Sequence, residues 1–281
     1  MIPMWLNILY IYIMPINTVL KIYAISFIAT MLMLCVWIFL NHHFTGSVWY
    51  GMKLSQSVLK VEYCELNNTA AFFHQSMNTY SNLGYFFLGM IVILISIYDR
   101  KNIDRNKNLL RQFPSLSFFF GCCLVYLCFG SAFFHASLTW IGQRADMNGT
   151  YSVCIGLTGI GVYRAFIKKT SASFKKIYVA ILLLIVIVFI EVHLWISSFF
   201  LLPFLIVLLI AITLFNYYKT PGSISNAVYP IKFTVDHLCL YFACCRCRKN
   251  SLRSDFIFPG TRVVAFIYRH ERVLPVLVLL E

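Results

Sequence analysis

Charged residues are scarce in this sequence. They make up 12% of its 281 residues, whereas soluble domains carry about 25%. Apolar residues make up 60% of the chain, which is more than a soluble domain can bury in its core. The composition therefore excludes an ordinary soluble domain, and we expect a polytopic, all-α membrane protein.

Acidic residues are the scarcest charged group. Ten Asp and Glu stand against 23 Lys and Arg, which gives a formal net charge of +13. In a soluble protein this charge would suggest nucleic acid as a partner. Here the basic residues lie in short loops between apolar runs. We therefore attribute the charge to membrane topology and to contact with anionic headgroups, and we expect no nucleic-acid partner.

The ten cysteines form no recognisable framework. Five lie within apolar runs, where cysteine serves as a small apolar residue of a helix. The group at 244–247 stands beside two arginines, and its spacing is not that of a zinc finger. Acylation and metal binding both remain open for this group.

Long apolar runs predict the transmembrane helices. They cover residues 16–40, 78–98, 115–136, 145–167, 177–195 and 198–217, with a shorter run at 229–245. We divide the chain into an N-terminal part, 1–77, with one transmembrane helix and a polar loop, and a transmembrane core, 78–281. The tail of the core, 251–281, is atypical in sequence.

Loop charges predict the topology of these helices. The 99–114 and 168–176 loops are rich in Lys and Arg, which places them in the cytoplasm. The 41–77 and 138–144 loops then lie on the opposite face, together with the end of the 115–136 helix. Both a lumenal face of an ER or Golgi-type membrane and a periplasmic face of a bacterial inner membrane fit this arrangement.

Ser131, His135 and Asp146 form the most informative polar group in the sequence. Ser131 and His135 are four residues apart and share one helix face, and Asp146 opens the next helix after a polar break at 139–144. Histidine can ligate zinc, a carboxylate can orient a water molecule, and a hydroxyl can bind an oxyanion. A hydrogen-bonded trio that only stabilises the helix bundle is an equally good interpretation.

A second polar segment precedes the 78–98 helix. It contains Glu62-Tyr-Cys-Glu-Leu-Asn67 and then Gln75, Asn78, Ser81 and Asn82. Closely spaced carboxylate and amide oxygens can bind a hard cation. The spacing alone favours a simpler interpretation, a solvated loop followed by a helix cap.

The motifs Glu62-Tyr-Cys-Glu-Leu-Asn67, Asn78-Thr-Tyr-Ser-Asn82 and Gly130-Ser-Ala-Phe-Phe-His135 with Asp146 occur in an order that resembles the alkaline ceramidase family. This family belongs to the superfamily of seven-helix membrane hydrolases that includes the adiponectin receptors. The resemblance implies a seven-helix core with one extra helix before it. The implied activity is zinc-dependent cleavage of the amide of ceramide, a lipid partner, into sphingosine and a fatty acid.

The resemblance also implies roles for individual residues. His135 becomes a zinc ligand, Ser131 stabilises the oxyanion, and Asp146 orients or deprotonates the attacking water. The residues at positions where the family binds calcium are Glu62, Tyr63, Glu65, Asn67 and Gln75.

Two zinc ligands of the family are missing from this sequence. The family has a Gly-His-Ala-x-Trp-His motif at the start of its seventh helix, and this chain has Pro-Gly-Thr-Arg-Val-Val-Ala-Phe at 259–266. A shift of one base lets the codons of these eight residues encode Gln, Gly, His, Ala, Leu, Trp, His and Leu. We hypothesise that the reading frame slipped near Phe258, which leaves the last core helix aberrant and the zinc site incomplete.

Two other functional classes need weighing. A non-catalytic lipid-binding or receptor-like member of the same fold would also have an incomplete set of metal ligands. A transporter would need inverted repeats or paired broken helices, and the sequence shows neither. Apolar composition alone does not separate ceramide from other acylated lipids as the ligand.

Overall fold

The computed structural model describes residues 14–58, 65–101, 111–167 and 172–219, all of which belong to one compact unit. Their regular structure is helical, and six of the helices in these ranges are long and apolar enough to cross a membrane. The chain is therefore a multi-pass integral membrane protein. The predicted 229–245 helix and the 251–281 tail lie outside the described residues.

The observed helices follow the predicted apolar runs and extend most of them by a few residues. A short 3-10 helix, η1 (Gly46–Trp49), lies in the first long loop. The membrane helices are α2 (Ile16–His43), the consecutive pair α3 (Ser76–Ser81) and α4 (Leu83–Lys101), α5 (Pro114–Ser137), α6 (Trp140–Val162, continued by a π-helical turn, Tyr163–Ile167), α7 (Ala172–Trp195) and α8 (Ser198–Lys219).

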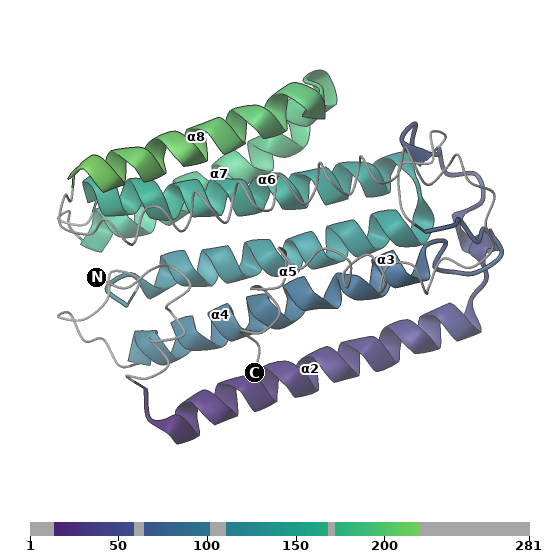
Figure 1. Ribbon diagram of the computed structural model, residues 1–281, viewed down its shortest axis with the longest axis horizontal. Coiled ribbons are helices and arrows are strands. Elements are labelled where there is room, and N and C mark those ends of the chain that lie inside the picture. The colour runs from purple at the N-terminus through teal and green to yellow at the C-terminus, as the bar shows by residue number, and fades with distance from the viewer. Residues whose placement is uncertain (1–13, 59–64, 102–110, 168–171, 220–281) are drawn as a thin grey trace, which may run out of the picture. The chain divides into compact units, whose positions relative to one another are not determined.

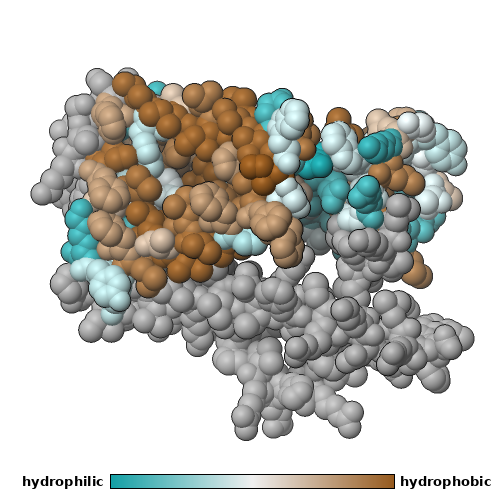
Figure 2. All heavy atoms as spheres, turned by 90° about the horizontal axis from the view of Figure 1, so that it is seen from above, coloured by the Kyte–Doolittle hydropathy of each residue, from teal (hydrophilic) through white to brown (hydrophobic). Residues whose placement is uncertain are grey.

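Helix α5 is the centre of the described bundle. It contacts α3, α4, α6 and α7, while α2 packs on α4 and α8 packs on α6 (Figure 1). Within its membrane span 61% of α5 is buried, against 11% of α8. Apolar side chains on the outer helices need no protein partner because lipid tails are equally apolar. Figure 2 shows such a face, apolar over its middle, with polar residues towards the ends.

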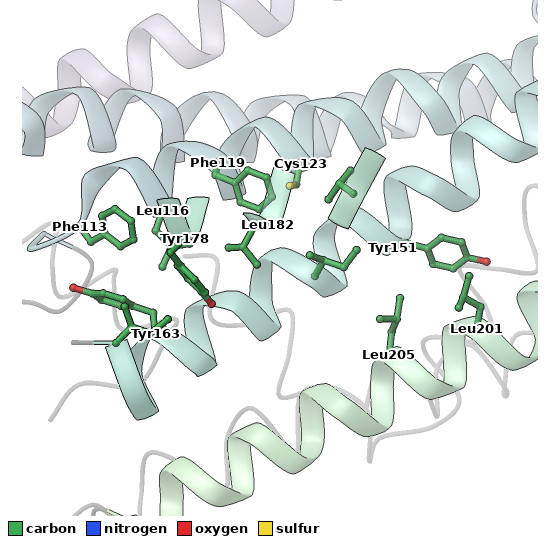
Figure 3. Packing of buried hydrophobic residues seen from close by; sticks show 13 residues of the cluster. Phe113, Leu116, Phe119, Cys123, Tyr151, Tyr163, Tyr178, Leu182, Leu201 and Leu205 are labelled. Atoms are coloured by element: carbon green, nitrogen blue, oxygen red, sulfur yellow. The ribbon is translucent and has the colours of Figure 1, made fainter. Parts of the chain in front are cut away.

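Two apolar clusters lie on either side of α5. One is built by α5, α6, α7 and α8, and Figure 3 shows Tyr151 of α6 close to Leu201 of α8 within it. The other joins α2, α4 and α5 around Trp37, Phe86 and Cys128. This packing on both sides fixes the position of α5, whose last turn carries His135.

The turn between α5 and α6 is shorter than the sequence predicted. Leu138 adopts a left-handed conformation with φ 54°, and the Thr139 side chain accepts a hydrogen bond from the backbone N–H of Gly142. This N-cap starts α6 at Trp140 rather than at residue 145. The polar residues up to Arg144 are therefore helical, and Asp146 lies in the second turn of α6 instead of opening it.

The long loop between α2 and α3 folds over the end of the α5–α6 pair. Ser55 donates its backbone N–H to the carbonyl of Leu138 (3.0 Å), and Trp140 donates to the carbonyl of Lys53 (2.7 Å). Further along the loop, the backbone N–H of Gln75 donates to the carbonyl of His135 (3.0 Å). The polar loop and the candidate residues thus meet at one end of the bundle.

Candidate functional site

Ser131 and Asp146 lie where the backbones of α5 and α6 come close together. The side chain of Ser131 lies near the Asp146 carboxyl group. Gly130 permits this approach, because a Cβ at this position would lie 2.6 Å from the carbonyl oxygen of Ala145. The structure therefore brings together the two residues that the sequence analysis assigned to catalysis.

His135 lies one turn beyond Ser131 on α5 and is held by the loop. Its Nδ1 lies 2.7 Å from Oε1 of Gln75, a residue that is only 1% exposed. Gln75 in turn donates from Nε2 to Oδ1 of Asn67 (2.7 Å). Because an amide oxygen only accepts hydrogen bonds, Nδ1 of His135 carries the proton, and Nε2 is the nitrogen suited to ligation.

Glu65 caps the short helix α3. Its two carboxylate oxygens accept hydrogen bonds from the backbone N–H groups of Met77 (2.9 Å) and Asn78 (2.8 Å). A carboxylate at this position also interacts favourably with the helix dipole. The Asn78 amide donates to Oε1 of Gln75 (3.1 Å), so the cap and the His135 contact form one network.

The described residues do not fit a zinc ion. Across the described ranges, no group of three or more His, Cys, Asp or Glu side chains could hold a metal. His135 therefore does not belong to a set of three such ligands in this part of the chain, whereas catalytic zinc needs about three protein ligands. Residues 259–266, where the missing ligands were expected, lie outside the described residues.

Three of the five residues expected to bind calcium lie in the described structure, and two do not. Glu65, Asn67 and Gln75 belong to the hydrogen-bonded network, where their oxygens accept from protein donors. Glu62 and Tyr63 lie outside the described residues. The observed network includes a helix cap, which is the interpretation that the spacing of these residues favoured. Calcium binding stays a prediction.

His74 is a buried neighbour of this network. It is 6% exposed, and neither ring nitrogen has a hydrogen-bond partner within the described part of the chain. Burial lowers the pKa of His74 below its ordinary value of 6.5, because desolvation disfavours the charged imidazolium. The ring is therefore neutral at pH 7.

A second polar group at the same end of the bundle was not found from the sequence. Arg144 of α6 donates from Nη1 to the backbone carbonyl of His193 at the end of α7. Gln143 accepts a hydrogen bond from the Ser55 hydroxyl (2.7 Å). The signal that could have revealed it is His193 itself, a lone imidazole inside the 177–195 apolar run, since ionisable residues in a membrane span are rare and often functional.

Comparison of the chain with models of protein families, with curated proteins and with solved structures finds no match in any of the three.

Proposed function

We propose that the chain is a ceramidase-like membrane protein, built as a hydrolase that cleaves the linear amide bond of ceramide or a related sphingolipid, and that this activity needs the restored reading frame. The proposed core has seven helices, of which α3–α4 to α8 supply five and residues 220–281 supply two, with α2 as the extra helix. The observation that carries the proposal is that Ser131 lies near Asp146, one turn from the His135 ring that contacts Gln75.

The described side chains would supply part of the chemistry that amide hydrolysis requires. Asp146 would accept the proton of the attacking water. The Ser131 hydroxyl, which lies against Asp146, would donate a hydrogen bond to the oxyanion that forms at the amide carbon. Gln75 would fix the ring and the tautomer of His135, as hydrogen-bond partners of metal ligands do.

The zinc-dependent step belongs to a chain with the restored reading frame. In the chain as written, one of three zinc ligands is present, and the loss of ligands from a metal set sharply weakens binding. We therefore propose no zinc-dependent step for this polypeptide and expect it to be inactive as a hydrolase.

A second candidate function is supported by the same set of residues. Among the described residues no group of three or more His, Cys, Asp or Glu side chains could hold a metal, which suits a non-catalytic lipid-binding or receptor-like member of this fold. Such a protein would bind ceramide and leave its amide intact.

Fatty-acid release from ceramide tests the proposal. Two full-length proteins are purified in detergent, the chain as written and a chain in which residues from 259 onward follow the shifted frame. The restored chain should release fatty acid, and its His135→Ala and Ser131→Ala variants should not. Ser96→Ala is the matched control, because Ser96 is a buried helical serine whose hydroxyl bonds only locally to the carbonyl of Ile93.

Two results of this assay bear on the two candidate functions. Ceramide binding without release by both chains would support the non-catalytic function. A folded restored chain that neither binds nor cleaves ceramide would overturn both. Sequencing of the gene end is the simpler prior test, because a shifted frame without two histidines four residues apart removes the basis for the restored chain.

A further inference from the structure

A cavity of about 430 Å³ lies on the side of α6 that faces α7 and α8. It is lined by the loop residues Gln56 and Ser57, by Gln143 and Arg144 of α6, and by the α7–α8 junction from His193 to Ser198. Its volume lies in the range of small-molecule sites, about 300–1,000 Å³. No Asp or Glu lines it, so its one fixed formal charge is that of Arg144.

Two buried polar atoms of the cavity lining have no hydrogen-bond partner within the described residues. They are Nε of Arg144 and Nε2 of His193, and the His193 side chain is 1% exposed. Buried polar atoms are normally paired, and an unsatisfied one destabilises the fold. Both atoms belong to residues that line the same cavity, so a ligand there would pair with them once the two side chains turn toward it.

The two atoms have opposite hydrogen-bonding roles. Arg144 Nε–H is a charged donor. Nδ1 of His193 lies 2.9 Å from the carbonyl oxygen of Phe189 and must donate to it, so Nε2 of the neutral ring is an acceptor. A matching ligand therefore presents an anionic oxygen to Arg144 and a hydroxyl to His193.

Further positive potential surrounds the cavity. The N-terminus of the 22-residue helix α8 forms part of its wall, and the positive end of a helix dipole favours anions. A smaller neighbouring cavity of about 170 Å³ shares Arg144 and adds Lys53. Both cations lie over the Trp140 ring, with Lys53 Nζ at 5.6 Å and Arg144 Cζ at 5.1 Å from its centroid.

We propose that this cavity binds a phosphate group with a hydroxyl beside it, as in a phosphoglycerol lipid headgroup. The phosphate would pair with Arg144, and the hydroxyl would donate to Nε2 of His193. The cavity lies at the ends of membrane helices, next to Trp140 and to Trp195, which is 88% exposed. Tryptophan at this depth marks the headgroup region, which favours a lipid over a free phosphate.

Binding to the full-length chain in neutral detergent tests the proposal by thermal unfolding and native mass spectrometry. The lipids are short-chain phosphatidylglycerol, phosphatidylethanol and phosphatidylcholine with the same acyl chains, and the free ligands are glycerol 3-phosphate and inorganic phosphate. Phosphatidylethanol has the same phosphodiester without the hydroxyls. The unmodified chain should bind phosphatidylglycerol most tightly, then phosphatidylethanol, with phosphatidylcholine weakest.

Variants assign the two contacts. Arg144→Gln should weaken phosphatidylglycerol about tenfold or more, as expected for the loss of a charged hydrogen bond. His193→Phe should make phosphatidylglycerol and phosphatidylethanol bind equally. Arg100→Gln, which removes one exposed positive charge from the end of α4 outside the cavity, should change neither affinity.

Each outcome decides the proposal. Saturable binding of glycerol 3-phosphate or inorganic phosphate that is lost in Arg144→Gln would support the phosphate site and assign it to a free ligand. Equal binding of phosphatidylglycerol and phosphatidylcholine by the unmodified chain would overturn it, even if a variant fails to fold. An Arg144→Gln protein that binds phosphatidylglycerol as the unmodified chain does would also overturn it.

Discussion

The close approach of the two helices of the candidate site at Gly130 provides the sharpest test of the packing. Replacing Gly130 by Ala adds one methyl group where α5 meets α6. The new Cβ would lie 2.6 Å from the carbonyl oxygen and 2.9 Å from the carbonyl carbon of Ala145. Both are backbone atoms, so no side-chain rotation can relieve the contact.

The expected cost follows from this geometry. Ordinary contacts of a Cβ begin at 3.4 Å, so the helices must separate by about 0.8 Å at this point. Overpacking of this kind costs about 1–3 kcal/mol. The gain in helix propensity returns about 1 kcal/mol. We expect Gly130→Ala to lower the free energy of unfolding by about 1 kcal/mol.

Gly84→Ala is the matched control for this substitution. Gly84 is also a helical glycine, in the first turn of α4, and a Cβ there would meet no atom within 4 Å. Its replacement should raise the free energy of unfolding by about 0.5 kcal/mol through helix propensity alone. Unfolding of both variants is followed by circular dichroism during titration of mixed micelles with a denaturing detergent. A Gly130→Ala protein as stable as Gly84→Ala would refute the close approach of α5 and α6.

Other predictions concern the loop and the opposite end of the bundle. Burial lowers the pKa of His74, so below pH 6.5 the unfolded state binds more protons than the folded state. The free energy of unfolding should therefore fall between pH 7 and pH 5. His74→Leu should flatten that pH dependence. Arg111 and Asp99 form a buried ion pair (3.1 Å, with side chains 7% and 4% exposed), so Arg111→Met should cost about 3–5 kcal/mol in the same unfolding assay. Adding Asp99→Leu should recover much of that loss, and a double variant no better than the single one would contradict the pairing. Glu65→Ala, which removes the cap of α3, should cost about 1 kcal/mol, whereas no loss of stability would argue against the cap.

The helices of the described bundle could be predicted from the sequence, because each needs a long apolar run to cross the bilayer. The start of α6 could not, since it depends on the left-handed Leu138 and on the cap by Thr139, and both are local geometries inside a polar stretch. The grouping of Ser131 with Asp146 followed from their places on consecutive helices. The contact of Gln75 with His135, 60 residues away, needed the path of the loop.

The cavity beside Arg144 could not be predicted from the sequence for a similar reason. Arg144 lay in a presumed turn, and His193 stood alone in an apolar helix 49 residues away. Only the packing of α6 against α7 brings them together. The zinc site could not be tested in the same way. The resemblance implies two further histidine ligands beside His135, and the described residues contain no such set of ligands.

The ratio of zinc to protein, measured by elemental analysis, tests the proposed function most directly. The chain as written and the frame-restored chain are purified in parallel after exposure to zinc and removal of the excess. We predict a ratio near zero for the first, about one for the second, and a sharp loss in the restored chain carrying His135→Ala. About one zinc per molecule of the chain as written, or none in a folded restored chain, would contradict the proposed role of His135.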